Sequence, residues 1–367
     1  MISELLAVIA VLLVVLVGVL VYMIRRGGHV VTGDPTRLGY YRDLELLSDK
    51  GSYGKVYKAY NTKDKRWCVL KVLRDDKLND QEEVSRFFNE SVLIGAIKER
   101  HEQAPIVGVY AKGTIKAEGL SRPFIEMEYV DGGDLEGYIR SKGRVTAEWA
   151  ERIVVQIVRA LDAAHDSKVI HRDLKPGNML LSKGDLDKVV VCDFGVGKRI
   201  DVTSIQSGGF GTAHYMSPEQ CIEGGRITPA TDIYSLGVIF YELLTGDKLF
   251  TGDGSNIFTV VDQHRHKDPS LLIRERIPER YQRLIAGMLS KDPTARPRLA
   301  EITQSLSESA RTVPGYKSAV PAKPSPTITS TSTGSSSFGT GQYRRIFNRM
   351  DIKVVLAGIG LLVMVPI

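Results

Sequence analysis

Hydrophobic residues are distributed unevenly along this chain. Residues 5–24 are twenty consecutive uncharged positions rich in leucine and valine, and Arg25 and Arg26 come directly after them. As an α-helix this stretch would be about 30 Å long, the thickness of the hydrocarbon core of a bilayer. The pattern predicts a transmembrane anchor over residues 1–26, with the arginine pair holding the downstream residues in the cytoplasm. A cleaved signal peptide is the alternative, but the chain has neither a basic region before Leu5 nor a small-residue cleavage site after the apolar run.

The last quarter of the chain changes character twice. After a connector at residues 27–39 and a long central region, residues 311–343 are dominated by Ser, Thr, Pro and Gly, which predicts a disordered linker. Residues 344–367 are a basic flank followed by fourteen uncharged residues, 354–367. As a helix those fourteen would measure about 21 Å, which is short for a span. A membrane re-entry, an interfacial anchor and the start of a longer span all remain open.

The central region, residues 40–310, has the pattern of a globular domain. Short β-type runs separated by turn residues predict antiparallel strands at residues 41–47, 55–60 and 67–73, and a further strand leads into residues 128–130. Apolar periodicity predicts helices at residues 81–98 and 146–167, and the apolar run at residues 232–244 predicts a helix that is buried on all sides. In the first helix the expected apolar face consists of Phe87, Phe88, Val92, Ile94 and Ile97. Thr146 is the expected cap of the second helix.

A charged loop between apolar anchors is the strongest candidate for a functional site. It lies in residues 169–181, which read VIHRDLKPGNMLL. Within it, Asp173 can accept a proton from a hydroxyl group, and Asn178 can ligate a metal from the same turn. A second acidic residue, Asp193, comes after the uninterrupted apolar run at residues 189–192. A carboxylate leaving a buried strand is costly unless it is compensated by a cation.

These motifs resemble those of the eukaryotic-like (Hanks-type) protein kinases. The string HRDLKPGN matches the catalytic loop of that family at eight consecutive positions, and DFG, CVLK and SPE resemble three further motifs. The resemblance implies an α+β, bilobal protein-kinase fold, with a small antiparallel β lobe that carries one helix and a larger, mainly helical lobe. It further implies Asp173 as the acceptor of the substrate proton, and ATP and Mg²⁺ as cofactors, with Asp193 and Asn178 as metal ligands.

The resemblance also implies a nucleotide site between the two lobes. Lys71, flanked by apolar residues, is expected to be a buried charge held by Glu90 of the following helix. Lys175 would offset charge on the transferred phosphoryl group. Other implied nucleotide contacts are Gly51 and Gly54 of the loop over the phosphates, Val56 over the adenine, the backbone of Glu128 and Val130, and Asp134 at the ribose. The family's loop has three glycines, and Asp49 occupies the first of those positions here.

The segment at residues 211–219 resembles the part of a kinase on which a protein substrate lies; we call it the docking segment. Its Thr212, together with Lys175, favours serine/threonine over tyrosine specificity. Arg296 is the expected partner of Glu219, and Asp232 is expected to brace the catalytic loop. Arg172, directly before Asp173, would meet a phosphate on the preceding polar segment, for which Thr203, Ser204 and Ser207 are the candidate acceptors.

Composition narrows the choice of partners. The net charge of +6 is concentrated in the flanks, since residues 311–367 sum to +6 and residues 1–37 to +1, which leaves −1 for residues 38–310. We therefore expect membrane lipid rather than nucleic acid as a partner, alongside protein substrates; a homodimer stays open. Cys68, Cys192 and Cys221 lack metal-ligand spacing and are expected to be reduced core thiols.

The sequence thus predicts a serine/threonine protein kinase of the bacterial membrane-anchored type. It would sit in the cytoplasmic membrane with one or two passes, with its kinase domain in the cytoplasm, and would phosphorylate its own activation segment. A membrane-tethered pseudokinase scaffold that binds nucleotide without efficient transfer is the alternative, although Lys71, Asp173 and Asp193 are all kept. A small-molecule kinase of related fold would lack the docking segment.

Overall fold

The computed structural model describes residues 40–49, 54–117, 120–194, 210–252 and 257–311, all within one compact unit of the chain, residues 1–321. The predicted anchor and connector, the linker and the C-terminal hydrophobic segment lie outside the described residues. Within the described ranges, no helix combines the length and the apolar character needed to cross a membrane.

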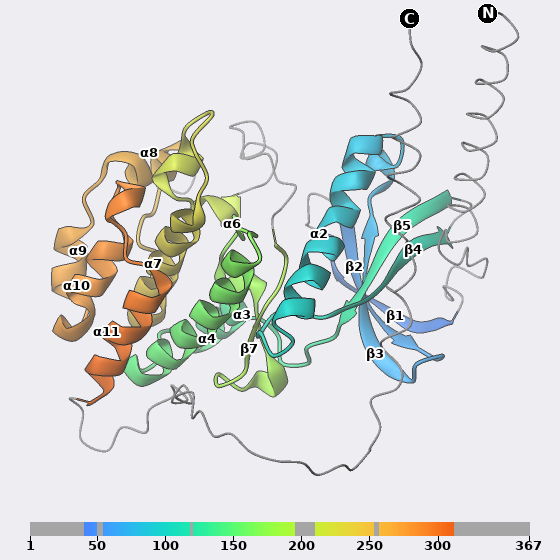
Figure 1. Ribbon diagram of the computed structural model, residues 1–367, viewed down its shortest axis with the longest axis horizontal. Helices are drawn as coiled ribbons and strands as arrows, with labels where there is room; N and C mark the ends of the chain where they lie inside the picture. Colours follow the sequence, from blue (N-terminus) through green and yellow to red (C-terminus); the bar gives the residue numbers. More distant parts are fainter. Residues whose placement is uncertain (1–39, 50–53, 118–119, 195–209, 253–256, 312–367) are drawn as a thin grey trace, which may run out of the picture. The chain divides into compact units, whose positions relative to one another are not determined.

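The first part of the described domain is an antiparallel sheet of five strands in the order β1-β2-β3-β5-β4 (Figure 1). The strands are β1 (Tyr41–Ser48), β2 (Gly54–Asn61), β3 (Arg66–Leu73), β4 (Val109–Ala117) and β5 (Leu120–Glu128). The three strands predicted first along the chain are confirmed. Gly54 is required by close packing, because a Cβ there would lie 2.6 Å from the carbonyl oxygen of Val72.

Helix α2 (Gln81–Arg100) comes after the short helix η1 (Asp75–Lys77) and packs against β4 and β5. The Asp80 side chain caps it by accepting from two backbone N–H groups. The buried positions are Phe87, Glu90, Ser91, Ile94 and Ile97, the spacing of one helix face. The prediction that Val92 belongs to this face was wrong: its side chain is 51% exposed. At 100° per residue, Val92 points away from the stripe that Ser91 completes.

The second part is mainly helical. Its elements are α3 (Leu135–Lys142), α4 (Ala147–Asp166), η2 (Pro176–Asn178), β6 (Met179–Leu181), η3 (Ser182–Gly184), β7 (Val189–Val191), α6 (Phe210–Ala213), η4 (Pro218–Cys221), α7 (Pro229–Thr245), α8 (Ile257–His266), α9 (Ser270–Arg276), α10 (Glu279–Met288), η5 (Pro293–Ala295) and α11 (Leu299–Arg311). The predicted cap of α4 is confirmed, since the Thr146 hydroxyl accepts from the Trp149 N–H at 3.4 Å.

Helix α7 is the centre of this lobe and packs against α4 and α10 (Figure 1). Every residue from Thr231 to Leu244 is buried, as the sequence predicted for this helix. Gly237 allows the close approach of α10, because a Cβ at this position would lie 2.9 Å from the Cβ of Met288. The helix ends at Gly246, whose φ of 81° lies in the left-handed region that glycine adopts readily.

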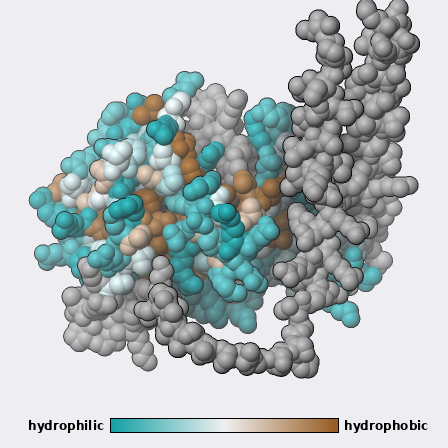
Figure 2. All heavy atoms as spheres, viewed as in Figure 1, coloured by the Kyte–Doolittle hydropathy of each residue, from teal (hydrophilic) through white to brown (hydrophobic). Residues whose placement is uncertain are grey.

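Most apolar side chains are inside. The largest cluster of buried residues spans the helical lobe and the β6–β7 hairpin, and two smaller clusters fill the sheet and its contact with α2. On the face seen in Figure 2, hydrophobic residues appear as small patches among hydrophilic ones. The three cysteines are free thiols, as predicted, and burial raises the pKa of Cys68 and of Cys221 to about 12.

Candidate active site

The catalytic loop connects α4 to β6, and its backbone is held in place by hydrogen bonds to a side chain of α7. Both carboxylate oxygens of Asp232 accept backbone N–H groups of this loop, from His171 at 2.9 Å and from Arg172 at 2.9 Å. The same carboxylate also contacts the His165 ring at 2.8 Å. The bracing role predicted for Asp232 is therefore present in the structure. It fixes the backbone immediately before Asp173.

His171 ties the loop to the start of the next functional segment. Its Nε2 lies 3.1 Å from the carbonyl oxygen of Cys192, and its Nδ1 accepts the N–H of Asp173 at 3.3 Å. A carbonyl can only accept, so Nε2 carries the proton. Burial lowers the pKa of His171, which keeps the ring neutral and preserves this arrangement. One imidazole thus links the backbone of Asp173 to the residue before Asp193.

Asp173 lies beside Lys175 and Asn178, and Lys175 connects it to Thr212 of the docking segment. Lys175 places its Nζ 3.0 Å from Asp173 Oδ2 and 2.9 Å from the Thr212 hydroxyl. The Asn178 amide donates to the Asp173 carbonyl oxygen at 2.7 Å. Asp173 is 2% exposed, so its carboxylate depends on these neighbours for compensation. The structure brings together all four residues, which the sequence had placed on the loop and on the docking segment.

Lys71 bridges two carboxylates across the two lobes. Its Nζ lies 2.7 Å from Glu90 Oε2 on α2 and 2.7 Å from Asp193 Oδ1 after β7. The predicted pairing with Glu90 is therefore present. Burial alone would lower the pKa of Lys71, but the charges of Asp193 and Glu90 outweigh it and raise the pKa. The ammonium stays charged and sets the position of both carboxylates.

Asp193 adopts a backbone conformation that is uncommon for a residue with a side chain. Its φ is 57°, in the left-handed region, and its side chain is 36% exposed. Such conformations persist where surrounding contacts impose them, and they are frequent at functional sites. Here the neighbouring backbone is held by His171 and the carboxylate by Lys71, so the strained residue presents its oxygens next to the catalytic loop.

The oxygen-bearing side chains fit a magnesium site. Asp193 supplies a carboxylate, and Asn178 supplies an amide whose nitrogen is already donating to Asp173, which leaves its oxygen as the ligand atom. Mg²⁺ prefers such oxygen ligands in small number, with phosphate and water completing the shell. The described residues contain no cluster of three or more His, Cys, Asp or Glu side chains that could form a protein-only metal cage.

The remaining residues predicted to contact nucleotide lie along the sheet and its exit. Val56 is opposite Lys71 in the β2–β3 ladder. The Glu128 N–H donates to the Gly108 carbonyl at 2.9 Å, so an adenine contact at Glu128 would have to use its carbonyl. Asp134 caps α3 by accepting the Gly137 N–H at 2.7 Å, a role that sequence reasoning missed. Gly54 and Val130 are described, whereas Gly51 lies outside the described residues.

The docking segment is anchored to the helical lobe by side chains of α7. The Tyr215 hydroxyl donates to Glu242 of α7 at 2.6 Å, and the Ser235 hydroxyl donates to the Tyr215 carbonyl at 2.7 Å. Sequence reasoning missed these anchors, because they pair residues 20 to 27 positions apart and Glu242 falls inside an apolar helix. Glu242 is a charged residue among apolar neighbours in the sequence, and this pattern could have revealed that it has a buried partner.

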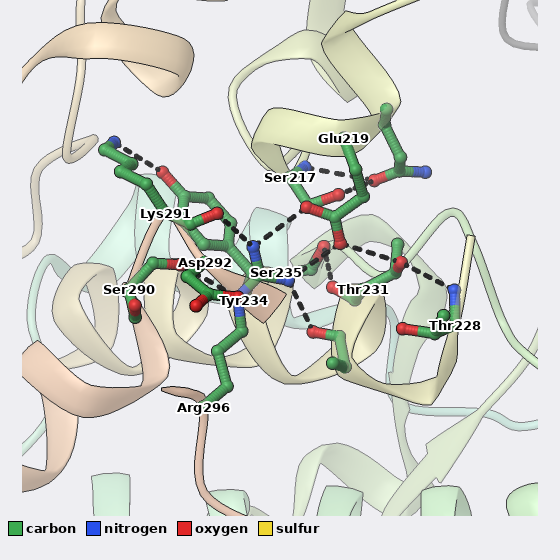
Figure 3. A network of polar contacts seen from close by, with 12 residues as sticks. Ser217, Glu219, Thr228, Thr231, Tyr234, Ser235, Ser290, Lys291, Asp292 and Arg296 are labelled. Atoms are coloured by element: carbon green, nitrogen blue, oxygen red, sulfur yellow. Dashed lines mark hydrogen bonds and ion pairs between the residues drawn. The ribbon is translucent and has the colours of Figure 1, made fainter. Parts of the chain in front are cut away.

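Glu219 and Arg296 form the predicted buried ion pair (Figure 3). Arg296 binds both carboxylate oxygens, at 2.7 Å and 2.8 Å, and the Thr231 hydroxyl donates to the same carboxylate at 2.9 Å. Burial would raise the pKa of Glu219, but the hydrogen bonds and charge of Arg296 outweigh this and lower it. The pair joins the end of the docking segment to the segment after α10.

Among the described residues, one polar atom of Arg172, the guanidinium Nε, is buried without a hydrogen-bond partner. The Arg172 carbonyl accepts the Gln220 amide at 2.8 Å. The backbone φ of 67° places Arg172 in the left-handed region. The three predicted phosphate acceptors, Thr203, Ser204 and Ser207, lie outside the described residues.

This geometry is that of a protein kinase, and comparison with known proteins agrees: residues 45–306 match the protein kinase domain, and the chain belongs to that family. Among similar curated proteins, serine/threonine-protein kinase PknA of Mycobacterium tuberculosis is 34% identical over 71% of this chain and 59% of its own length. A probable serine/threonine-protein kinase of Clostridium perfringens is 35% identical over 71% of this chain and 36% of its own, and serine/threonine-protein kinase pkn3 of Myxococcus xanthus is 36% identical over 72% and 49%. The chain thus spans between about a third and three fifths of the length of these relatives.

Proposed function

We propose that this chain is a serine/threonine protein kinase that transfers the γ-phosphoryl group of ATP to hydroxyl groups of proteins. The observation that carries the proposal is the contact of Lys175 with both Asp173 and Thr212, at 3.0 Å and 2.9 Å. It couples the residue that accepts the substrate proton to the segment on which the substrate lies. The names of the bacterial relatives support the same specificity.

Catalysis by this site rests on positioning and on charge neutralisation. Mg²⁺ bound by Asp193 and Asn178 would neutralise charge on the phosphates. Lys71, held between Glu90 and Asp193, would orient the phosphates. Asp173 accepts the proton of the attacking hydroxyl. The Lys175 ammonium offsets negative charge on the transferred phosphoryl group.

The direct test is transfer of labelled phosphate from Mg-ATP to myelin basic protein by the wild-type chain and by its Asp193→Asn variant. We expect phosphoserine or phosphothreonine with the wild type only. A folded wild-type chain that binds nucleotide but transfers nothing would favour the pseudokinase scaffold instead. Labelling of tyrosine alone would contradict the assigned specificity.

We also propose that residues 1–26 anchor the kinase in a membrane with residues 40–310 on the cytoplasmic side. Support comes from the twenty uncharged residues 5–24 and from Arg25 and Arg26 behind them. Protease added to sealed, right-side-out cells should then leave the kinase domain intact until the cells are lysed. Cleavage within residues 40–310 before lysis would overturn this orientation.

A third proposal is that phosphorylation of Thr203, Ser204 or Ser207 activates the kinase. A phosphate adds about −1.5 to −2 charge and forms about one to three charge-assisted hydrogen bonds with arginine, and the buried Nε of Arg172 has no hydrogen-bond partner among the residues that the structure describes. Replacing all three hydroxyl residues by alanine should therefore remove most of the activity. Mass spectrometry after incubation with Mg-ATP should find phosphate on at least one of them. Full activity of the triple variant would refute the switch.

A further inference from the structure

The docking segment receives one hydrogen bond from a fully buried histidine. Nε2 of His264, on α8, lies 3.0 Å from the carbonyl oxygen of His214, two residues after Thr212. His264 is 0% exposed and packs between the rings of Tyr234 and Phe250. No motif described above requires a histidine at this position.

The partners of His264 leave it only one tautomer. A backbone carbonyl cannot donate, so Nε2 carries the proton and Nδ1 must accept. The Tyr234 hydroxyl lies 3.1 Å from Nδ1 and is the donor. Burial, reinforced by the nearby charge of Lys291, lowers the pKa of His264 to about 3, so the ring stays neutral at pH 7.

The same chain of hydrogen bonds begins at Lys291, after α10. Its Nζ lies 3.3 Å from the Tyr234 hydroxyl oxygen, a contact drawn in Figure 3, and 2.7 Å from the His264 carbonyl. An ammonium only donates, so the direction of every bond is fixed: Lys291 donates to Tyr234, Tyr234 to His264, and His264 to the docking segment. We call these three side chains the anchor relay.

We propose that the anchor relay positions the docking segment and thereby sets the affinity of the enzyme for its protein substrate. This rests on the proposed kinase function. Among the described residues, the hydrogen bonds and ring contacts of His264 involve Tyr234, Phe250, Lys291 and the His214 carbonyl rather than a predicted catalytic or nucleotide residue. Its bond ends on the same segment whose Thr212 contacts Lys175. The nucleotide-side contacts of Lys71 with Glu90 and Asp193 share no residue with the relay. A disturbed relay should therefore weaken substrate binding and leave nucleotide binding unchanged.

The test is Tyr234→Phe in the full chain. This substitution keeps the ring and removes the hydroxyl that holds His264 in its donating tautomer. Since one such hydrogen bond is worth about 0.5–1.5 kcal/mol, KM for myelin basic protein should rise about twofold to twelvefold while KM for ATP stays unchanged. Deuterium exchange of the amides in residues 211–219 should become faster.

The matched control is Tyr281→Phe, which removes an equally buried hydroxyl that donates to Glu151 at 3.0 Å, away from the docking segment. It should lower Tm at least as much, because this hydroxyl donates to a carboxylate, and it should change neither KM nor the exchange of residues 211–219. His264→Gln, which keeps a donor for the His214 carbonyl, should remain near wild type, whereas His264→Leu should resemble Tyr234→Phe.

Two outcomes would overturn the proposal: equal effects of Tyr234→Phe and Tyr281→Phe on substrate KM and exchange, or a rise in KM for ATP equal to that for substrate. Deuterium exchange needs no catalysis, so it separates the two hypotheses. If the wild type transfers no phosphate but Tyr234→Phe still loosens residues 211–219 selectively, the kinase function fails and the anchoring stands. If the wild type is active and exchange is unchanged, the anchoring fails alone.

Discussion

Replacing Asp193 by asparagine is expected to lower phosphate transfer by a factor on the order of 10³ or more, because the substitution removes the only carboxylate proposed to bind Mg²⁺. The fold should survive. An asparagine oxygen can still accept from Lys71, which lies 2.7 Å from Asp193 Oδ1 and keeps its second partner Glu90. The loss should therefore appear in turnover without a matching loss of Tm.

The control for this prediction is Asp187→Asn. Asp187 is an exposed carboxylate that contacts Arg152 at 3.3 Å on the surface, so the same chemical change there should leave transfer unchanged. Measurement of labelled phosphate incorporation and of thermal unfolding on both variants separates catalysis from stability. Undiminished transfer by folded Asp193→Asn would remove Asp193 from the metal site.

Replacing Arg296 by leucine should destabilise the kinase domain by about 3–5 kcal/mol, the usual cost of breaking a buried ion pair by removing one partner. The Glu219 side chain is 8% exposed and Arg296 is 0% exposed, so the remaining carboxylate would be a buried charge without its cationic partner, held by the weaker hydrogen bond of the Thr231 hydroxyl. Urea unfolding of both proteins at pH 7 measures the difference. A loss below about 1 kcal/mol would show that the pair contributes little.

Arg298→Leu provides the comparison two residues further on. Arg298 pairs with Glu301 on the surface with its side chain 87% exposed, and its loss should change stability little or not at all. The pH dependence gives a second check. Since Arg296 lowers the pKa of Glu219, the ion pair stabilises the fold above the usual carboxyl pKa of 4.5 and this contribution is lost as the pH falls. The gap between wild type and Arg296→Leu should therefore narrow below pH 4.5.

The residues that meet at the site were predictable where chemistry demands adjacent sequence positions. Asp173, Lys175 and Asn178 share one short loop. Asp193 comes directly after an uninterrupted apolar run, which predicts a buried strand. The apolar neighbours of Lys71 indicated a buried charge that needs a partner. The choice of Glu90 as that partner came from the resemblance to protein kinases, because several acidic residues of the same helix were available.

The contacts that were missed depend on tertiary structure alone. The hydrogen bonds from His264 to His214 and from Tyr234 to His264 join residues 50 and 30 positions apart, and no periodicity connects them. The prediction that Val92 is buried was wrong for a different reason. It is as apolar as its neighbours, and only the exact phase of α2 shows that Ser91, rather than Val92, faces the core.

The burial of α7 has a consequence for how the site is distributed over the folding units of the domain. Because α7 is buried from Thr231 to Leu244, we expect its amides to exchange through global unfolding rather than through local opening. Asp232 of this helix forms hydrogen bonds with the catalytic loop, and Ser235 and Glu242 form hydrogen bonds with the docking segment. The part of the site with Asp173, proposed to accept the substrate proton, is therefore built on the part of the domain that we expect to be most protected. Lys71 and Glu90 belong to the smaller sheet lobe. Thermal fluctuations should therefore open the sheet lobe, with the residues proposed to hold nucleotide, before they open the part of the domain that is built on α7.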